Sequence, residues 1–517
     1  MQSAASSERA SPIAMPTTSH AALGLAAAAG AAAIYLLLRR RADRWRHVDR
    51  RKVHTVKHTF SKGGGLLNLW VADMELECAT HIVDALVRRA AHPTYGYTIQ
   101  PEIIWERIAE WLVARQSWAH KPIAESFVFS ANVVASFASA LRALTAEGDA
   151  VVIMVPAYEP LQACVTGCGR RLVLHPLTRD HANGGGGQHH GGYSMDLPGL
   201  MRTLEREAPK ALLLLNPHNP LGRVWTQSEL SRLAAACADK GVLVISDEIW
   251  ADWIVNTTHS KDGGRLTGIE ERAYVYTAPC GMVGQDGRQK AASRFVPFAS
   301  VAGRCRHLTL GGPTKTFNLA GLHCSYAIIE DTSMRRKFLS HVTPGTHHFG
   351  SVFATAALLA AYSDLKKSAE WLDGAIGHVR SNAVWLTCYL EEQLQKGGGS
   401  NGAARLIVPL RLDATYLMWL DCTNLVHRLK LKLPSGLDRF FVEECKLCLS
   451  AGHEFDPTGA SDACMRINLA CPRRMVEQAA ERIRSAVGRA LAASPPPVKN
   501  GSKKRAQLDL GAKNGAA

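Results

Sequence analysis

The feature that most constrains the fold is an alternation of short apolar runs with longer stretches of helical periodicity between about residues 59 and 493. The stretches 135–146 and 226–240 repeat their apolar residues at helical spacing. Uninterrupted apolar strands that alternate with helices are typical of a parallel sheet covered on both faces. We therefore expect an α/β fold, in which ligands bind beyond the carboxyl ends of the strands. The expected strands are 151–155, 211–215, 242–245, 307–310 and 326–329.

The composition is that of a folded protein, with 517 residues of which 47% are hydrophobic and 20% are charged. The formal net charge is +15, but residues 1–58 carry +7 of it and residues 494–517 carry +4. Only +4 remains for the 435 residues between the two ends. The basic character therefore belongs to the ends, and we expect no nucleic-acid partner for the body of the chain.

The 13 cysteines show no repeated spacing. Cys445 and Cys448 form one Cys-x-x-Cys pair, without a second pair to complete a four-ligand zinc site. We expect reduced, buried thiols and no metal centre.

The N-terminal 58 residues have the pattern of a targeting or anchoring segment. Residues 21–38 carry no charge, and at about 1.5 Å per residue a helix of this length just spans a bilayer core. Nine Lys or Arg residues follow within 39–58, which predicts a transmembrane anchor with the catalytic body on the cytoplasmic side. The Ser- and Thr-rich start is equally consistent with an organellar transit peptide that is cleaved.

Low-complexity tracts predict surface insertions at about 181–192, 258–294 and 396–402. The tail 494–517, with its proline run and basic cluster, is predicted to be disordered.

Four groups of polar residues lie where a parallel sheet would place its ligand. Each alone has a simple structural explanation as a turn, a helix cap or a surface charge. Their order and spacing are together more specific. The groups are Asn216-Pro217-His218-Asn219-Pro220-Leu221-Gly222, Ser246-Asp247-Glu248, Gly311-Gly312-Pro313-Thr314-Lys315-Thr316-Phe317-Asn318 and Arg466-Ile467-Asn468-Leu469-Ala470-Cys471-Pro472-Arg473.

With Trp70-Val71-Ala72-Asp73-Met74-Glu75 and Gly96-Tyr97-Thr98, these groups resemble the fold-type I pyridoxal-phosphate (PLP) enzymes of the class I/II aminotransferase superfamily. Within it, the chain is most similar to the cystathionine β-lyase-like C–S lyases, over about residues 60–490. The resemblance implies a large PLP-binding domain at 101–350, with a mostly parallel seven-stranded sheet covered by helices. It also implies a smaller α+β domain built from 59–100 and 351–493.

The resemblance assigns a role to each motif. Lys315 would bond covalently to the cofactor and then act as the base that removes the Cα proton. Asp247 would pair with the pyridine nitrogen, Asn219 would donate to the phenolic oxygen, and Tyr158 would stack on the ring. Arg466 would bind the substrate α-carboxylate with both arms of its guanidinium group.

The cofactor phosphate would lie at a helix start formed by Asn132, Val133 and Val134, where free amides and the helix dipole attract anions. The resemblance also implies a homodimer in which Tyr97 reaches the phosphate of the neighbouring subunit. Thr314 and His323 are further candidates for phosphate contacts.

The chain departs from the family pattern at four places. His323 stands where relatives often carry a cationic phosphate ligand, and Asp456-Pro457-Thr458-Gly459 replaces a loop that is richer in glycine in the lyase branch. Trp250 stands where many relatives have a tyrosine that donates to the phenolic oxygen, and Gly312 lacks a hydroxyl that relatives often direct at the phosphate.

The resemblance favours β-elimination from cystathionine or another cysteine S-conjugate, which yields a thiol, pyruvate and ammonia. Transamination of an amino-acid substrate, with the same lysine, aspartate and arginine, is the alternative. A tethered, non-catalytic regulator with this fold is a third reading.

Overall fold

The computed structural model describes residues 45, 48–59, 65–179, 192–257, 294–342, 350–395 and 405–493. The tail and the segment 21–38 lie outside the described residues, as do the predicted insertions except for their boundary residues 192 and 294.

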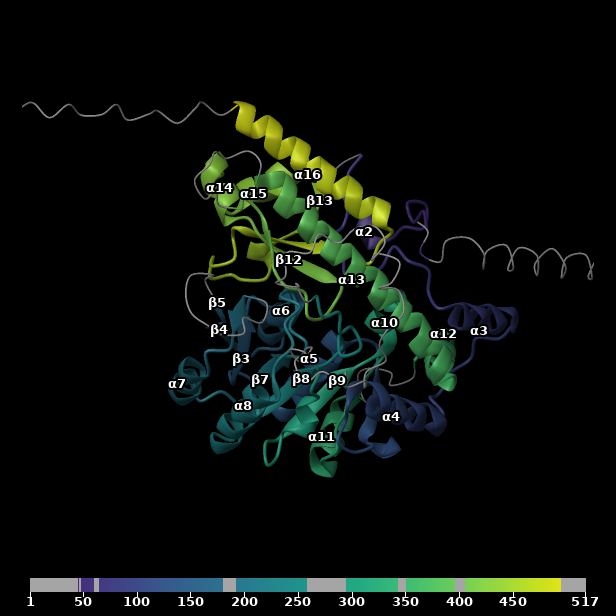
Figure 1. Cartoon of the computed structure of the whole chain (residues 1–517). Coiled ribbons are helices and arrows are strands. Elements are labelled where there is room, and N and C mark those ends of the chain that lie inside the picture. The colour runs from purple at the N-terminus through teal and green to yellow at the C-terminus, as the bar shows by residue number, and fades with distance from the viewer. Residues whose placement is uncertain are drawn as a thin grey trace, which may run out of the picture.

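A seven-stranded sheet with the order β2-β10-β9-β8-β7-β3-β4 forms the centre of the large domain (Figure 1). The five strands from β9 to β4 are parallel, and β10 runs antiparallel to both of its neighbours. The prediction of a mostly parallel seven-stranded sheet is therefore confirmed. The strands are β2 (Phe127–Ser130), β3 (Ala150–Val155), β4 (Arg171–Pro176), β7 (Ala211–Leu215), β8 (Leu243–Asp247), β9 (His307–Gly311) and β10 (Ser325–Ile328).

Helices cover both faces of this sheet because its central strands are apolar on both sides. One apolar core joins the sheet to α5 (Val133–Leu144), α6 (Glu159–Gly167) and α11 (Thr332–Val342). A second core joins the opposite face to α7 (Leu197–Glu207) and α8 (Gln227–Asp239). A capping box formed by Thr226 and Glu229 starts α8.

The smaller domain is built around a four-stranded antiparallel sheet with the order β11-β12-β15-β14. Its strands are β11 (Val408–Pro409), β12 (Leu417–Asp421), β14 (Ser450–Ala451) and β15 (Cys464–Asn468). The long helices α13 (Leu365–Gln395) and α16 (Arg473–Ala493) lie side by side beside this sheet (Figure 1). β1 (Leu67–Asn68) pairs in parallel with β13 (Leu447–Cys448), so segments from the first and the last part of the described residues meet in this domain.

The remaining helices and strands connect or flank these two sheets. They are α2 (Val56–Thr59), α3 (Thr80–Ala91), α4 (Glu102–Gln116), α10 (Pro313–Thr316), α12 (Val352–Ser363), α14 (Thr423–Leu429), α15 (Ser435–Arg439), β5 (Thr178–Arg179) and β6 (Tyr193–Ser194).

The predicted transmembrane helix and the membrane-anchored localisation are contradicted. Within the described ranges no helix is both long enough and apolar enough to cross a bilayer. The long helices α13 and α16 carry charged residues along their length, which makes them unsuited to a hydrocarbon environment. The segment 21–38, to which the anchor was assigned, lies outside the described residues.

Candidate active site

The carboxyl ends of three neighbouring parallel strands bring the central motifs together. Asp247, at the end of β8, is in register with Leu215 of β7 and Leu310 of β9. β7 leads into the loop that carries Asn219, and β9 leads into α10, which carries Lys315. Parallel strands place all three side chains at one edge of the sheet, as the sequence predicted.

The Lys315 amine is held against the main chain of the N-terminal segment. Its Nζ donates to the Ala72 carbonyl at 2.8 Å and lies 5.5 Å from the centre of the Trp250 ring. Trp253 donates its indole N–H to the Lys315 carbonyl at 2.8 Å, which fixes the backbone of α10. Burial lowers the pKa of Lys315 to about 8, with an opposing effect from Asp73. A substantial fraction of this amine is therefore neutral near pH 7–8.

Asp247 is a buried carboxyl group that accepts a hydrogen bond from the Ile249 N–H at 3.1 Å. Burial raises its pKa to about 7, although that hydrogen bond and the charge of Lys315 oppose the rise. A cationic N–H partner beside this oxygen would restore its charge at neutral pH.

Arg466 lies in β15 and is buried beneath the segment that carries Trp70. Nη1 donates to Asn219 Oδ1 at 3.0 Å, while Nη2 donates to the Trp70 carbonyl at 3.0 Å and to Ser450 Oγ at 3.1 Å. The guanidinium lies 4.6 Å from the ring centre of Phe455. Burial lowers its pKa to about 10, which still leaves the group charged at neutral pH.

Arg466 Nε is buried and has no hydrogen-bond partner among the described residues. A buried cation with an unused N–H fits a site that accepts an anionic group.

Tyr158 follows β3 and precedes α6, with about a third of its surface exposed. Burial raises the pKa of Tyr158, the charge of Arg466 lowers it, and the charge of Asp247 raises it further. The tyrosine therefore lies within electrostatic range of the arginine and the aspartate.

Of the residues predicted to contact the phosphate, three lie together at the start of α5. Asn132 caps α5 by accepting from the Ala135 N–H at 2.9 Å, and Val133 and Val134 form the first turn of this helix. Thr314 is half-buried at the start of α10. His323 is exposed in a left-handed backbone conformation, with φ of 52°.

Tyr97 is fully exposed, with 100% relative accessibility, and no described contact brings it to these residues within one chain.

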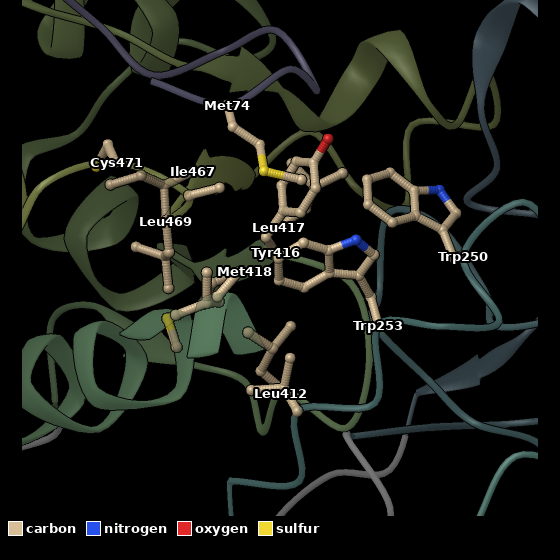
Figure 2. Packing of buried hydrophobic residues seen from close by; sticks show 14 of the residues in the cluster. Met74, Trp250, Trp253, Leu412, Tyr416, Leu417, Met418, Ile467, Leu469 and Cys471 are labelled. Carbon is tan, nitrogen blue, oxygen red and sulfur yellow. The ribbon is translucent and has the colours of Figure 1, made fainter. Parts of the chain in front are cut away.

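The departures from the family pattern at Trp250 and Gly312 have visible structural reasons. Trp250 lies edge-to-face with Tyr416, at a centroid distance of 4.7 Å (Figure 2). At Gly312, an added Cβ would lie 2.9 Å from Ser325 Cα, so a residue with a hydroxyl does not fit without movement. The turn between β9 and α10 therefore accommodates glycine at this position and no larger residue without rearrangement.

Sequence reasoning missed Tyr416 and the role of main-chain carbonyl groups. Figure 2 shows Tyr416 beside the Trp250 and Trp253 rings, and its hydroxyl donates to the Ala72 carbonyl at 2.9 Å. Asn468 donates to the Val71 carbonyl and the Asp73 carbonyl, each at 2.7 Å. Of these groups, only Asn468 could have been singled out from the sequence, because it lies two residues after Arg466 in the same motif.

The segment 70–76 is also anchored from outside the site by buried ion pairs. Lys57 Nζ lies 2.8 Å from Asp73 Oδ1 and 3.0 Å from Glu75 Oε1. Arg50 donates to Glu75 at 2.9 Å and also pairs with Asp73. We call Arg50, Lys57, Asp73 and Glu75 the N-terminal ion cluster. Part of residues 48–58, which the sequence assigned to the N-terminal targeting or anchoring segment, thus contacts the folded body.

The residues present fit PLP in their chemistry. The site offers an amine of lowered pKa, a buried carboxyl group for which no ion pair within 4 Å is found among the described residues, and a guanidinium whose Nε–H is unused there. The start of α5 adds a helix N-terminus of the kind that binds phosphate.

Comparison with known proteins gives a consistent picture. The family model described as aminotransferase class I and II matches residues 65–483. The cystathionine beta-lyase PatB of Bacillus subtilis is 29% identical over 421 residues, covering 81% of this chain and 92% of that protein. A putative cystathionine beta-lyase of Mycobacterium leprae is 27% identical over 442 residues, covering 82% of this chain and 92% of that protein.

Among solved structures, a PLP-bound putative aminotransferase from Clostridium difficile 630 has a TM-score of 0.70 and 28% identity. It covers 86% of this chain and 99% of its own.

Proposed function

Because this chain belongs to the family of class I and II aminotransferases, we propose that it is a PLP-dependent C–S lyase. The reaction is β-elimination from a cysteine S-conjugate such as cystathionine, which with one water yields a thiol, pyruvate and ammonia. The observation that carries this proposal is the meeting of Lys315, Asp247 and Arg466 in one buried site. The similarity to PatB over 81% of the chain favours elimination.

Each residue of the site has a proposed role in holding the cofactor. Asp247 would receive the pyridine N–H, and this cation would supply the partner that the buried carboxyl group needs. The Oδ1 atom of Asn219 is engaged by Arg466, so its amide nitrogen would donate to the phenolic oxygen. Tyr158 would cover one face of the ring.

The phosphate would accept from the α5 start at Asn132, Val133 and Val134, with Thr314 and His323 at its side. When bound, PLP supplies an electron-accepting ring that stabilises negative charge at the substrate Cα.

Lys315 would act as the base. Its pKa of about 8 places the neutral amine within reach of physiological pH, so Nζ can accept the Cα proton. The β-substituent then leaves as a thiolate. The protonated Lys315 amine would be a proton donor for it.

Arg466 would bind the substrate α-carboxylate. Its contacts to Asn219, Ser450 and the Trp70 carbonyl fix the guanidinium plane before substrate arrives, which reduces the entropy lost on binding. The buried Nε–H is a donor available to that carboxylate.

A homodimer would complete the site. Exposed apolar side chains gather between the end of α3 and the start of α4, and they are Val87, Tyr95, Tyr97, Ile99 and Ile103. A cluster of this kind is typical of an interaction surface. A second copy of the chain would bury it and bring Tyr97 of the partner subunit to the phosphate.

The test uses the purified full-length protein loaded with PLP and given cystathionine. We expect repeated release of pyruvate and of a free thiol, together with near-visible absorbance from the lysine-bound cofactor. Lys315→Ala should lose that absorbance and at least about 1000-fold of the activity, since both the covalent link and the base are removed. Lys337→Ala, which changes an exposed lysine on α11, is the matched control.

Two outcomes would count against the proposal. Formation of a 2-oxo acid that keeps the thioether, without free thiol, would identify an aminotransferase. Full biological activity of Lys315→Ala would indicate a non-catalytic protein.

A further inference from the structure

The N-terminal ion cluster has a buried centre although it contains four charged groups, and its outer members Arg50 and Asp73 are each 17% exposed. Lys57 is 0% exposed and Glu75 is 1% exposed. The cluster holds two cations and two anions, so its formal charges balance. Although burial opposes the shift, Arg50 and Lys57 lower the pKa of Asp73. Such a cluster is costly to desolvate and gains its stability from close mutual pairing, so it fixes geometry strongly.

The cluster also binds the main chain of the 70–76 segment directly. Lys57 Nζ donates to the Asp73 carbonyl at 2.9 Å, and Arg50 Nη1 donates to the Met74 carbonyl at 3.0 Å. The Trp70 indole N–H donates in return to the Lys57 carbonyl at 3.1 Å. The segment forms no regular helix or strand between residues 69 and 79, so these side-chain contacts replace a regular hydrogen-bond ladder.

On its other side, the same segment presents carbonyl groups to the active site. The Trp70 carbonyl accepts from Arg466, and the Ala72 carbonyl accepts from Lys315. The acceptors for the substrate-binding arginine and for the catalytic amine are therefore two residues apart on one short piece of backbone. Asp73, which follows directly, belongs to the ion cluster.

We propose that Lys57 and Arg50 are positioning residues of the active site: by clamping the 70–76 segment, they set the orientation of Lys315 and Arg466. This inference rests on the proposed roles of those two residues. It makes part of the basic N-terminal segment a working component of the site, which the catalytic motifs themselves do not reveal.

The charges that surround Lys315 give the proposal a specific signature. Besides burial, its pKa is raised by Asp73 and Asp247 and lowered by Arg466 and Lys57. Tyr416, which shares the Ala72 carbonyl, has a pKa raised by burial and stays neutral. Removing the charge of Lys57 should therefore raise the pKa of Lys315, and removing the charge of Asp73 should lower it.

The experiment measures the pKa of Lys315 in the full-length chain without cofactor. The rate of reductive methylation at Lys315 is followed by mass spectrometry as a function of pH. We expect Lys57→Met to raise the pKa, and Asp73→Asn to lower it, by roughly 0.3–1 pH unit each. Lys52→Met, which removes an exposed lysine five residues away, should leave it unchanged.

A purely structural role predicts a different result. Loosening of the fold admits water to Lys315 and raises its pKa in both variants, so shifts of the same sign would overturn the proposal. The double variant Lys57→Met with Asp73→Asn keeps the cluster neutral and leaves the Arg50–Glu75 pair in place. This double variant is measured in place of a single variant that fails to fold. We expect the pKa of Lys315 in the double variant to lie between its values in the two single variants.

A second readout concerns Arg466 in the loaded enzyme. Arg50→Met should raise KM for the amino-acid substrate by about fivefold, the effect of one weakened hydrogen bond. Arg51→Met is the matched control, because Arg51 pairs with Asp49 at the surface. Unchanged KM and unchanged Lys315 pKa would overturn the positioning role while the lyase function stands. Shifts of opposite sign in a protein without lyase activity would reject the function and keep the positioning role.

Discussion

Tyr416 illustrates how a single residue outside the recognised motifs becomes part of the site. It is fully buried, and its ring packs edge-to-face against Trp250 and Trp253 at 4.7 and 4.9 Å. Its hydroxyl donates to the same Ala72 carbonyl that accepts from Lys315. Tyr416 therefore helps to hold in place the Ala72 carbonyl that binds the Lys315 amine.

Tyr416→Phe should keep the aromatic packing and lose only this hydrogen bond. We expect a loss of about 1 kcal/mol in the free energy of unfolding, because Lys315 still satisfies the Ala72 carbonyl. The turnover number should fall roughly three- to tenfold, since the Ala72 carbonyl that binds the Lys315 amine is held less rigidly. Denaturant unfolding and steady-state kinetics measure the two effects. Tyr193→Phe, at a buried tyrosine on β6, is the control, and an equal loss of activity there would contradict the prediction.

Asp247 should make the stability of the cofactor-free protein depend on pH. Its folded pKa of about 7 lies above the unfolded value of 3.8, so the unfolded chain releases its proton first as the pH rises. Stability should therefore fall between about pH 4 and pH 7 and then level off. Glu248, whose pKa burial raises to about 7, contributes in the same direction.

Asp247→Asn should reduce this fall by an amount on the order of 1–4 kcal/mol and leave the part due to Glu248. Denaturant midpoints at pH 5 and pH 7.5 measure it. An unchanged pH dependence in the variant would show that the carboxyl group ionises freely in the folded chain.

The junction between β9 and α10 shows how an element limits what the site can carry. Gly312 lies against the backbone of Ser325 in β10, so the approach of two strands excludes a side chain there. The missing phosphate hydroxyl is therefore a consequence of strand packing and cannot be restored by one substitution.

Gly312→Ser should destabilise the protein by about 1–3 kcal/mol and weaken cofactor binding, because the new Cβ forces the two strands apart. Thermal unfolding and a PLP titration monitored by absorbance test this. Gly321→Ser is the matched control, since an added Cβ at Gly321 meets nothing within 4 Å. Tighter PLP binding by Gly312→Ser would contradict the steric argument.

At the level of elements, the sequence indicated strands and their polar ends well, since apolar runs and the residues that follow them are local features. The run 211–215 matches β7 residue for residue, and Asp247 and Lys315 lie near the strand ends as expected. The antiparallel direction of β10 was not predictable, because an apolar run does not encode its direction. The Ala72 carbonyl was not predictable either, because main-chain acceptors leave no signature in the side chains and its partner Lys315 is 243 residues away.

At the scale of the whole molecule, the exposed apolar segment between α3 and α4 is the surface that the proposed homodimer would bury. Ile99 is 66% exposed and Tyr97 is fully exposed, while the interior of the same domain is closely packed. The basic residues of 39–58 were wrongly interpreted as the flank of a membrane anchor. Charge density alone does not distinguish such a flank from a segment whose Arg50 and Lys57 pair with carboxylates of the folded body.

Ile99→Asp should convert the proposed dimer to a monomer, because a charge at the centre of an apolar interface is costly to desolvate. Activity should fall at least about tenfold, since Tyr97 of the partner subunit would no longer complete the proposed phosphate site. Light scattering on a sizing column gives the oligomeric state. Ile123→Asp, at a residue 62% exposed outside this segment, is the control. A dimer that persists in Ile99→Asp would place the interface elsewhere.

The meeting of early and late segments of the chain has a consequence for synthesis on the ribosome. The Trp70 carbonyl accepts hydrogen bonds from Ser450 and Arg466. The ribosome adds these residues 380 and 396 positions after Trp70. At translation rates of about 5–20 residues per second, that delay is roughly 20–80 seconds. The central sheet can form in this interval, but the site is incomplete until Ser450 and Arg466 have emerged from the ribosome. Catalysis therefore cannot begin when the central sheet forms and has to wait for the smaller domain.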